Sequence, residues 1–246
     1  MLLSAEKVSR SFGSLMALAD ATLEVAAGEI IGLIGPNGAG KSTFFNCIAG
    51  DLVPTAGRIV FDGADLTRAP PEVHAERGIG RTFQVPATFA DMTILENVMI
   101  GAFLRHSSRA AARASALDAI AFAGLQPVAF APASSLGTPG RKRLEIARVL
   151  ATEPKLLLLD EALAGLNPAE IQDAIALVRR IHARGVTIVI VEHIMEVILT
   201  LAERVLVFNQ GRTIANGKPQ EVVANPEVVA AYLGRRHAGD AGAHAP

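Results

Sequence analysis

A glycine-rich segment followed by a lysine and two hydroxyl residues lies at residues 35–43. Its spacing matches the phosphate-binding pattern GxxxxGK(S/T) at every fixed position. Glycines let a backbone fold around an anion with its N–H groups pointing inward, and a lysine can then reach the outer phosphates of a nucleotide. We expect Ser42 to bind Mg²⁺ and Thr43 to place a hydroxyl near the α-phosphate. The candidate nucleotide-binding residues of this segment are Gly35, Pro36, Asn37, Gly38, Ala39, Gly40, Lys41, Ser42 and Thr43.

A second candidate site is the carboxylate pair Asp160 and Glu161, which follows an aliphatic run at residues 156–159. At the end of a buried strand, Asp160 is suited to hold Mg²⁺ through water, and Glu161 to polarise an attacking water as a general base. On its own, the pair equally fits a strand that runs into a polar loop. Beside the phosphate-binding pattern it indicates hydrolysis of a nucleotide, with ATP and Mg²⁺ as the bound groups. GTP is disfavoured because the chain has no NKxD-like segment where a GTPase would carry one.

The elements that must position these residues are typical of an α/β fold. Continuous aliphatic runs indicate parallel strands buried on both faces. Such runs recur at residues 30–34, 156–159, 188–191 and 205–208. Residues 169–184 have helical spacing between a capping Asn167 and a helix-ending Gly185, and a short helix over 41–49 would point its N-terminus at the phosphates. This strand–helix–strand order predicts a mostly parallel sheet flanked by helices.

Two regions depart from that pattern. Residues 1–28 and 57–63 indicate short antiparallel strands, and residues 86–150 are alanine-rich and helical in character. Within the latter, 110–123 can form one helix, whereas the prolines between 127 and 139 exclude a continuous helix there. We predict one domain over 1–246, with a helical insertion at 86–150. Its α/β core with an N-terminal antiparallel β-subdomain spans 1–85 and 151–234, and a disordered tail spans 235–246.

The composition narrows the class of protein. Half of the residues are hydrophobic, yet no run approaches the roughly 18 apolar residues of a membrane-spanning helix. The first ten residues include charged side chains and form no signal-peptide core, so we expect neither a signal peptide nor a transmembrane segment. A net charge of −1 provides no whole-chain attraction for nucleic acid, and the single cysteine, Cys47, excludes an intramolecular disulfide.

The order of motifs along the chain resembles that of the ATP-binding subunits of ABC transporters, which have a P-loop NTPase core. After the phosphate-binding pattern come the motifs at residues 80–84, 141–150, 156–161, 164–167 and 191–193. The resemblance implies that Gln84 contacts Mg²⁺ and the hydrolytic water and couples to a membrane subunit. It also implies that His193 contacts the γ-phosphate, that Asn167 lies at a dimer interface, and that Phe12 stacks on adenine.

Each of these four residues also has a purely structural interpretation. Gln84 also fits an ordinary surface amide, and His193 also fits a histidine whose hydrogen bonds are satisfied within a loop. Asn167 is explained as a helix cap whatever else it does, and Phe12 fits packing inside a small sheet. Only the joint order and spacing of the motifs favour the functional roles.

One motif departs from the family pattern, in which a signature LSGGQ precedes a helix. An ungapped alignment places residues 136–140 there, so that Gly137 replaces the serine, Pro139 replaces a glycine, and Thr138 and Gly140 complete the candidate dimer interface. Proline has no N–H to offer a phosphate. A second register that begins at Ser135 restores a serine but needs two extra residues before the helix. The signature completes the partner's ATP site in this family, so we expect a heterodimer with one degraded site, and a homodimer is the alternative.

Within the family, the segments at residues 80–98, 143–148 and 225–234 resemble importers of branched-chain amino acids. This implies an ATPase on the cytoplasmic face of the inner membrane, with integral permease subunits and an extracytoplasmic substrate-binding protein as partners, and no nucleic acid. Importers of urea, amides or other amino acids, a weakly hydrolysing regulatory module, and a non-transport ABC ATPase are the alternatives. The permease is expected to dock near Gln84, against apolar residues that can equally be buried: Phe83, Val85, Phe89, Met92 and Ile94.

Overall fold

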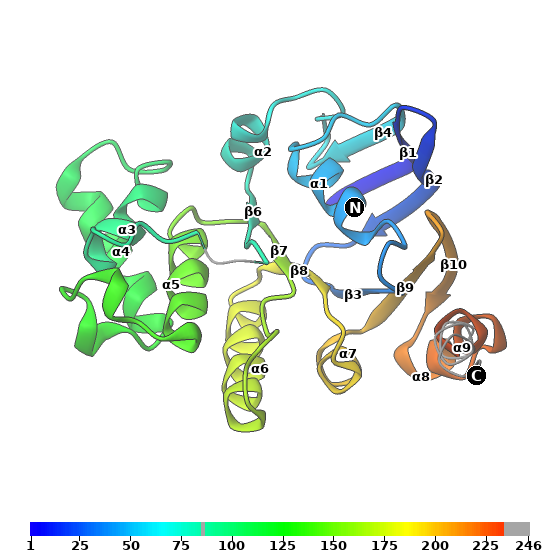
Figure 1. The fold of residues 1–246 in the computed structure, drawn as a ribbon. Helices are drawn as coiled ribbons and strands as arrows, with labels where there is room; N and C mark the ends of the chain where they lie inside the picture. The colour runs from blue at the N-terminus through cyan, green and yellow to red at the C-terminus, as the bar shows by residue number, and fades with distance from the viewer. Residues whose placement is uncertain (85–86, 234–246) are drawn as a thin grey trace, which may run out of the picture. The chain divides into compact units, whose positions relative to one another are not determined.

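The structure, a computed structural model, describes residues 1–84 and 87–233. These residues divide into two compact units, which we describe separately (Figure 1). Unit 1 combines Met1–Ala69 with the chain from Ile190 onwards, and unit 2 is Pro70–Val189. The tail for which we predict disorder, 235–246, lies outside the described residues.

Unit 1 contains a four-stranded sheet in the order β2-β1-β4-β5. Its strands are β1 (Leu3–Phe12), β2 (Leu15–Val25), β4 (Ala56–Phe61) and β5 (Ala64–Asp65). All neighbours are antiparallel, with Leu3 opposite Val25 on one side and Phe61 on the other. The antiparallel strands predicted over 1–28 and 57–63 are therefore confirmed.

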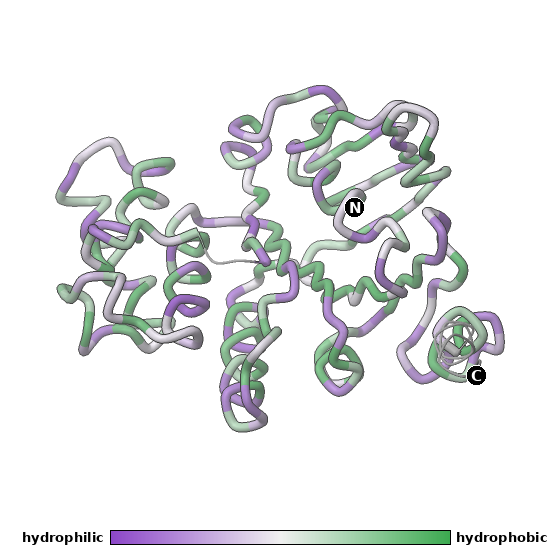
Figure 2. The backbone as a smooth tube through the Cα atoms, viewed as in Figure 1, coloured by the Kyte–Doolittle hydropathy of each residue, from purple (hydrophilic) through white to green (hydrophobic). Residues whose placement is uncertain are grey.

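Unit 1 also contains the strands that lead to the phosphate-binding pattern. β3 (Ile30–Ile34) runs parallel to β9 (Arg204–Asn209), and β10 (Arg212–Gly217) pairs antiparallel with β9. Every residue of β3 is buried. A fully buried strand needs no polar residues at alternate positions, which explains why the sequence of β3 contains none. Figure 2 colours the chain by the hydropathy of each residue. The helices of this unit are α1 (Lys41–Ala49), α7 (Met195–Leu201), α8 (Pro219–Val223) and α9 (Pro226–Leu233).

In unit 2, β6 (Ile79–Arg81) runs parallel to β7 (Leu156–Asp160). β8 (Thr187–Val191) is the neighbour of β7 in the sheet, on the side away from β6. The boundary between the units passes through β8. α2 (Pro71–Arg77) precedes β6, and α6 (Pro168–Ala183) follows β7. The sequence prediction for α6 is confirmed, since Asn167 caps it in a capping box and Gly185 follows its C-terminus with φ of 86°.

The rest of unit 2 is helical. α3 (Ile94–Ala102), α4 (Arg109–Phe122) and α5 (Thr138–Leu150) share one hydrophobic core, in which Ile94, Val98 and Leu144 are almost fully buried. Between α4 and α5 the chain forms no continuous helix but two short 3₁₀ turns, at Gln126–Val128 and Ala133–Ser135, as the prolines predict. These helices fall within the predicted insertion 86–150, whose boundaries remain a prediction.

Within the part of the chain that the structure describes, no helix combines the length and the apolar character needed to cross a bilayer.

Candidate functional site

The phosphate loop, residues 35–43, begins directly after β3 in unit 1. Gly35 has φ of 149°, and a Cβ atom added there would lie 2.2 Å from the carbonyl oxygen of Phe208 in β9. Both the backbone conformation and the lack of space exclude a side chain. Glycine is therefore required where the loop leaves the sheet.

Backbone hydrogen bonds hold the phosphate loop against its neighbours in unit 1. The carbonyl of Ala39 accepts from the Gly211 N–H at 2.9 Å, and the carbonyl of Gly211 accepts from the Ala19 N–H at 2.8 Å. Within the loop, the Ala39 N–H donates to the carbonyl of Pro36 at 3.1 Å. Main-chain groups therefore supply much of the shape of the loop.

α1 begins at Lys41, directly after Gly40, which has φ of 102°. No side chain caps this end of the helix. The first-turn N–H groups of a helix have no partner within it, and the positive end of the helix dipole points the same way. Ser42 is exposed and Thr43 is partly exposed in this turn. The end of α1 is therefore suited to bind phosphate.

The side chain of Lys41 folds back over the phosphate loop. Its Nζ atom donates to the carbonyl oxygen of Gly35 at 2.7 Å and to that of Pro36 at 3.0 Å, and the residue is only 6% exposed. The ammonium group consequently lies over the same loop whose N–H groups would surround an anion. The role of Lys41 at the outer phosphates stays a prediction.

The other candidate residues of unit 1 are Phe12 and His193. Phe12 ends β1 and is 44% exposed, with the Arg10 guanidinium carbon 4.9 Å from its ring centroid. It is therefore not packed inside the small sheet. His193 is exposed after β8 and precedes α7. Neither position by itself establishes a contact with nucleotide.

A second group of residues lies in unit 2, around the end of β7. It contains the candidates Gln84, Asp160 and Glu161 together with Arg81 and Thr82, and we call these five residues the carboxylate edge. Asp160 is 5% exposed, and the Nη2 atom of Arg81 lies 3.2 Å from the Oδ2 atom of Asp160. The backbone N–H of Asp160 donates to the Thr82 hydroxyl at 3.2 Å. The last residue of β6, Arg81, and the residue after it, Thr82, thus hold the buried carboxylate in place.

Glu161 has a left-handed backbone, with φ of 48°, directly after the buried strand. Non-glycine residues adopt this conformation at a cost, commonly at functional sites. The Gln84 side-chain amide donates to Glu161 Oε2 at 2.7 Å, and Lys142 Nζ donates to the Glu161 carbonyl oxygen at 3.2 Å. Two residues that we predict to act on the same water, Gln84 and Glu161, are therefore in direct contact.

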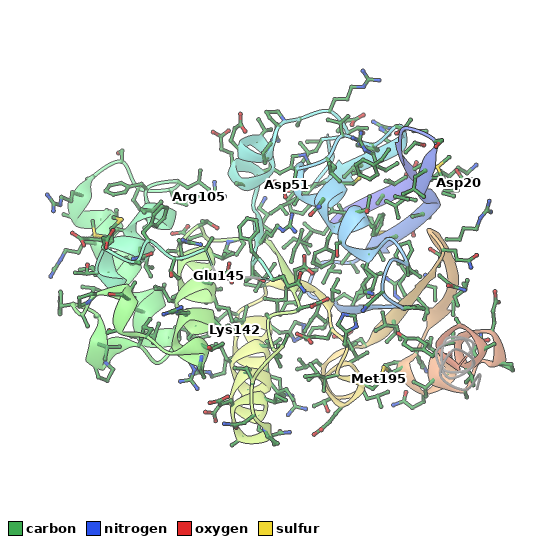
Figure 3. The ribbon with its side chains drawn as sticks, viewed as in Figure 1. Asp20, Asp51, Arg105, Lys142, Glu145 and Met195 are labelled. Atoms are coloured by element: carbon green, nitrogen blue, oxygen red, sulfur yellow. The ribbon has the colours of Figure 1, made fainter. Side chains whose placement is uncertain are left out.

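Lys142 belongs to α5, and the same helix buries Glu145, which is 3% exposed. Burial raises the pKa of Glu145, against the opposing effects of the Phe83 N–H that it accepts, the charges of Arg148 and Lys142, and the Ala87 N–H. Figure 3 labels Lys142 and Glu145 on this helix. A buried carboxyl group is thus part of the surroundings of Gln84.

The candidate signature lies at the start of α5. Gly137 is the N-cap residue, Thr138 begins the helix, and Pro139 lies in its first turn. The position of this helix start favours the ungapped register. Ser135, on which the other register depends, lies in a separate 3₁₀ turn and donates its hydroxyl to the carbonyl of Pro132 at 2.7 Å. Gly140 is only partly exposed, and a Cβ there would lie 2.9 Å from the side chain of Leu136.

Asn167 has a well-defined structural task. Its side-chain oxygen accepts the Glu170 N–H at 3.0 Å, and its own N–H donates to the Glu170 carboxylate at 2.8 Å. Asn167 is also exposed, so it is accessible to a partner while it caps α6. Its place at a dimer interface stays a prediction.

Sequence reasoning did not assign functions to Arg81, Thr82, Lys142 or Glu145. Arg81 and Thr82 lie inside the motif at 80–84, and Lys142 and Glu145 inside the motif at 141–150. The signal that was available for Lys142 and Glu145 is their spacing of three positions, which places both side chains on one face of a helix. The partners of these residues are far away in the sequence and could not be named from it.

Comparison with known proteins gives a consistent result. A family described as "ABC transporter" matches residues 18–164. A second, described as "Branched-chain amino acid ATP-binding cassette transporter", matches residues 212–238. The high-affinity branched-chain amino acid transport ATP-binding protein LivG of Escherichia coli (strain K12) is 40% identical over 251 residues, which cover 95% of this chain and 98% of LivG.

Two solved structures extend the comparison. The ADP conformation of MJ1267, an ATP-binding cassette of an ABC transporter, has a TM-score of 0.86 and 32% identity, and covers 95% of this chain and 98% of its own. A dimeric structure of the ATP-binding cassette MJ0796, in a post-hydrolysis state bound to ADP and Pi, has a TM-score of 0.80 and 26% identity, and covers 89% and 99%.

Proposed function

Since the chain belongs to the ABC transporter family, we propose that it is the subunit whose ATP hydrolysis powers an importer of branched-chain or related amino acids. As a member of that family it is an ATP-binding cassette with an α/β P-loop NTPase fold, and it couples ATP hydrolysis to transport. The observation that carries the proposal is the contact of 2.7 Å between the Gln84 amide and the Glu161 carboxylate, directly after a buried strand.

In the proposed reaction the phosphate loop binds the phosphates of ATP. The N–H groups of the loop and of the first turn of α1 would surround the phosphates, and Lys41 would exchange its two carbonyl partners for phosphate oxygens. Thr43 would add a hydroxyl to the same cradle. Phe12, exposed at the end of β1, is the proposed stacking surface for adenine.

The proposed metal is Mg²⁺, and the candidate residues fit it because they offer hard oxygen atoms: the hydroxyl of Ser42, the carboxylate of Asp160 and the amide oxygen of Gln84. Among the described residues no group of three or more His, Cys, Asp or Glu side chains could hold a metal by itself. Mg²⁺ at nucleotides commonly uses one or two protein ligands together with phosphates and water. When bound, it would neutralise charge that develops on the phosphates.

Glu161 would accept a proton from the attacking water, and Gln84 would orient that water through its amide. Arg81 and Thr82 fix Asp160, and Lys142 holds the strained backbone of Glu161. His193 is the proposed contact of the γ-phosphate. These roles divide the work between groups that bind phosphate and groups that place one water molecule.

A second ATP-binding subunit is the first proposed partner. The dimer described for the MJ0796 cassette supports a dimer of such subunits. We propose that its interface includes residues 137–140 and Asn167. Pro139 offers no N–H in the first turn of α5. For this reason we propose a heterodimer in which the site completed by this signature is the weaker one. Rapid turnover at both sites of a homodimer of the purified chain would contradict the heterodimer.

The further proposed partners are integral permease subunits and, through them, an extracytoplasmic substrate-binding protein, so the chain would act as a peripheral protein on the cytoplasmic face of the inner membrane. We propose the surface near Gln84 as the permease contact. Phe83 and Phe89 are 45% and 49% exposed there. Met92 is partly exposed, Ile94 is fully buried, and Val85 lies outside the described residues.

The test is Glu161→Gln in the full chain. Loss of a general base should lower the rate of phosphate release by about 100-fold or more while ATP binding is retained. Glu153→Gln, a change at an exposed carboxylate of unit 2, is the matched control and should keep the wild-type rate. A Glu161→Gln protein that hydrolyses ATP at the wild-type rate would contradict the proposed mechanism.

Uptake measurements test the substrate. In cells that depend on this transporter, Glu161→Gln should abolish uptake of labelled leucine, isoleucine and valine, and Glu153→Gln should not. Loss of urea, amide or other amino-acid uptake instead would identify another importer. The second candidate function, a weakly hydrolysing regulatory module, is favoured only by Pro139, and it predicts that wild-type protein has no ATPase rate to lose.

A further inference from the structure

Three charged side chains lie on one face of α5, each three residues after the last: Lys142, Glu145 and Arg148. Lys142 is 7% exposed and Glu145 is 3% exposed. Charged groups are rarely buried without a hydrogen-bond or charge partner. Lys142 donates to the Glu161 carbonyl oxygen, whereas Glu145 and Arg148 contact a different segment of unit 2.

Glu145 and Arg148 hold the backbone on both sides of Gln84. The Glu145 carboxylate accepts the Phe83 N–H at 3.0 Å, and the Ala87 N–H is a further donor to the same carboxyl. Arg148 Nη1 donates to the carbonyl oxygen of Ala87 at 2.6 Å. Residues 85–86 lie outside the described residues. The residue directly before Gln84 and the third residue after it are therefore both fastened to α5.

We propose that Glu145, assisted by Arg148, is a positioning residue for Gln84: it fixes the backbone on both sides of that glutamine to α5 and so places the Gln84 amide at Glu161. Gln84 is exposed, so packing does not hold its side chain. The backbone that carries it must then supply the order that the contact of 2.7 Å requires. The inference rests on the proposed ATPase activity.

Packing alone does not account for a carboxylate at position 145. Its exposure of 3% lies between those of its apolar neighbours Leu144 and Ile146, at 1% and 5%. An alkyl side chain would fill this place without the cost of removing a carboxylate from water. An alkyl side chain would, however, offer no acceptor for the Phe83 N–H. A buried donor without an acceptor lowers the stability of the fold.

The first experiment is hydrogen–deuterium exchange on the full chain. Glu145→Ala should accelerate exchange of the Phe83 and Ala87 amides by about tenfold or more, because their acceptor is lost. Exchange at Phe89, whose N–H donates to Asn97, should be unchanged and serves as the internal reference. Unchanged exchange at Phe83 would overturn the proposal.

Arg143→Ala is the matched control on the same helix. Arg143 pairs with Asp173 at the surface, 3.0 Å away, and has no contact with the segment around Gln84 among its hydrogen bonds and ion pairs. It should change neither exchange near Gln84 nor ATP hydrolysis. Glu145→Gln keeps an acceptor oxygen and should restore part of the protection, and it replaces Glu145→Ala if that variant fails to fold.

The second experiment is a double-mutant cycle in the form of the protein that hydrolyses ATP. Glu145→Ala should lower kcat by about tenfold while the KM for ATP changes by less than about twofold. In a Gln84→Ala background the same change should have an effect of less than about twofold, since its target is gone. Additive losses would mean that Glu145 acts on structure in general and would overturn the proposal.

The two experiments also separate this inference from the proposed function. If the wild-type chain has no ATPase activity in any assembly, the proposed function fails, and the exchange comparison alone decides whether Glu145 holds the segment around Gln84. If Glu161→Gln abolishes activity but Glu145→Ala leaves both kcat and exchange unchanged, the function stands and the positioning role is wrong.

Discussion

The phosphate loop of unit 1 and the carboxylate edge of unit 2 are built from different groups. The contacts that shape the phosphate loop use main-chain carbonyl oxygens as acceptors: the Gly211 N–H donates to the Ala39 carbonyl, and Lys41, within the same stretch, donates to the carbonyls of Gly35 and Pro36. Those of the carboxylate edge include side-chain pairs from distant parts of the chain, such as Gln84 and Glu161, which are 77 positions apart. One arrangement follows from a short stretch of sequence, and the other requires the fold of unit 2.

This difference determines how each region tolerates substitution. The stability of the phosphate loop should be most sensitive to an added Cβ atom where backbone approaches backbone. The carboxylate edge should be sensitive to the loss of a single polar partner, since a buried charge without its partner is costly. The three predictions below test that contrast, from the largest expected effect to the smallest.

The largest effect is expected for Gly35→Ala. The new Cβ would meet the Phe208 carbonyl oxygen at 2.2 Å, in a backbone conformation with φ of 149°. Overpacking and backbone strain together should lower the free energy of unfolding by at least about 3 kcal/mol. ATP binding should also be lost. Urea unfolding and nucleotide titration measure the two effects.

Gly13→Ala is the control for this prediction. Gly13 also has a positive φ, 59°, but an added Cβ would meet nothing within 4 Å. The loss there should be only about 1 kcal/mol, from the left-handed backbone alone. Equal losses at the two glycines would show that close backbone approach does not govern the phosphate loop.

An intermediate effect is expected for Arg81→Met, which keeps an aliphatic stem but removes the charge that pairs with Asp160. The side chains of this pair are 14% and 8% exposed. Breaking a pair buried to this degree should lower the free energy of unfolding by about 3 kcal/mol. Adding Asp160→Asn should recover a large part of the loss, because the buried side chain that has lost Arg81 then carries no charge.

The exposed pair Arg58 and Asp65 is the matched control, with side chains that are 59% and 48% exposed. Arg58→Met should leave the free energy of unfolding within experimental error, because solvent screens such pairs. The comparison would fail if both arginine substitutions destabilised the protein equally in urea unfolding.

The same contrast explains what could be predicted from the sequence. The fold class and the phosphate loop are local patterns: β3 is a run of buried aliphatic residues, α1 begins at the lysine of the pattern, and α6 begins at a capping box. Each depends on residues that are neighbours in the chain, so spacing alone carries the information.

The carboxylate edge could be predicted only as a set of separate residues. Asp160 and Glu161 were identifiable from their place after an aliphatic run, and Gln84 from the resemblance to a family. No local pattern predicts the pairing of Arg81 with Asp160 or the hydrogen bond from the Phe83 N–H to Glu145, because these contacts join residues that are far apart in the sequence. Tertiary packing selects such pairs, and a single sequence does not record them.

The smallest effect concerns pH, and it compares one carboxyl group from each unit. In unit 1, burial raises the pKa of Glu29, but the hydrogen bond from Arg204 at 2.8 Å, the Ala26 N–H and the Arg204 charge outweigh it, so this pKa lies below 4.5. In unit 2, burial outweighs the Phe83 N–H and the charge of Arg148, so the pKa of Glu145 lies above 4.5.

The two groups should therefore act on stability in opposite directions. The stabilising contribution of Glu29 is present above pH 4.5 and is lost as pH falls through its lowered pKa in the folded state. That of Glu145 is complete below pH 4.5 and is lost as pH rises through its raised pKa. Urea unfolding at a series of pH values measures the free energy of unfolding as a function of pH. Glu29→Gln should reduce the loss of this free energy at acid pH. Glu145→Gln should reduce its loss as the pH rises above 4.5. If both substitutions reduced the loss at the same end of the pH range, pairing would not distinguish the carboxylates of the two units, and the contrast drawn between the units would not extend to their titration.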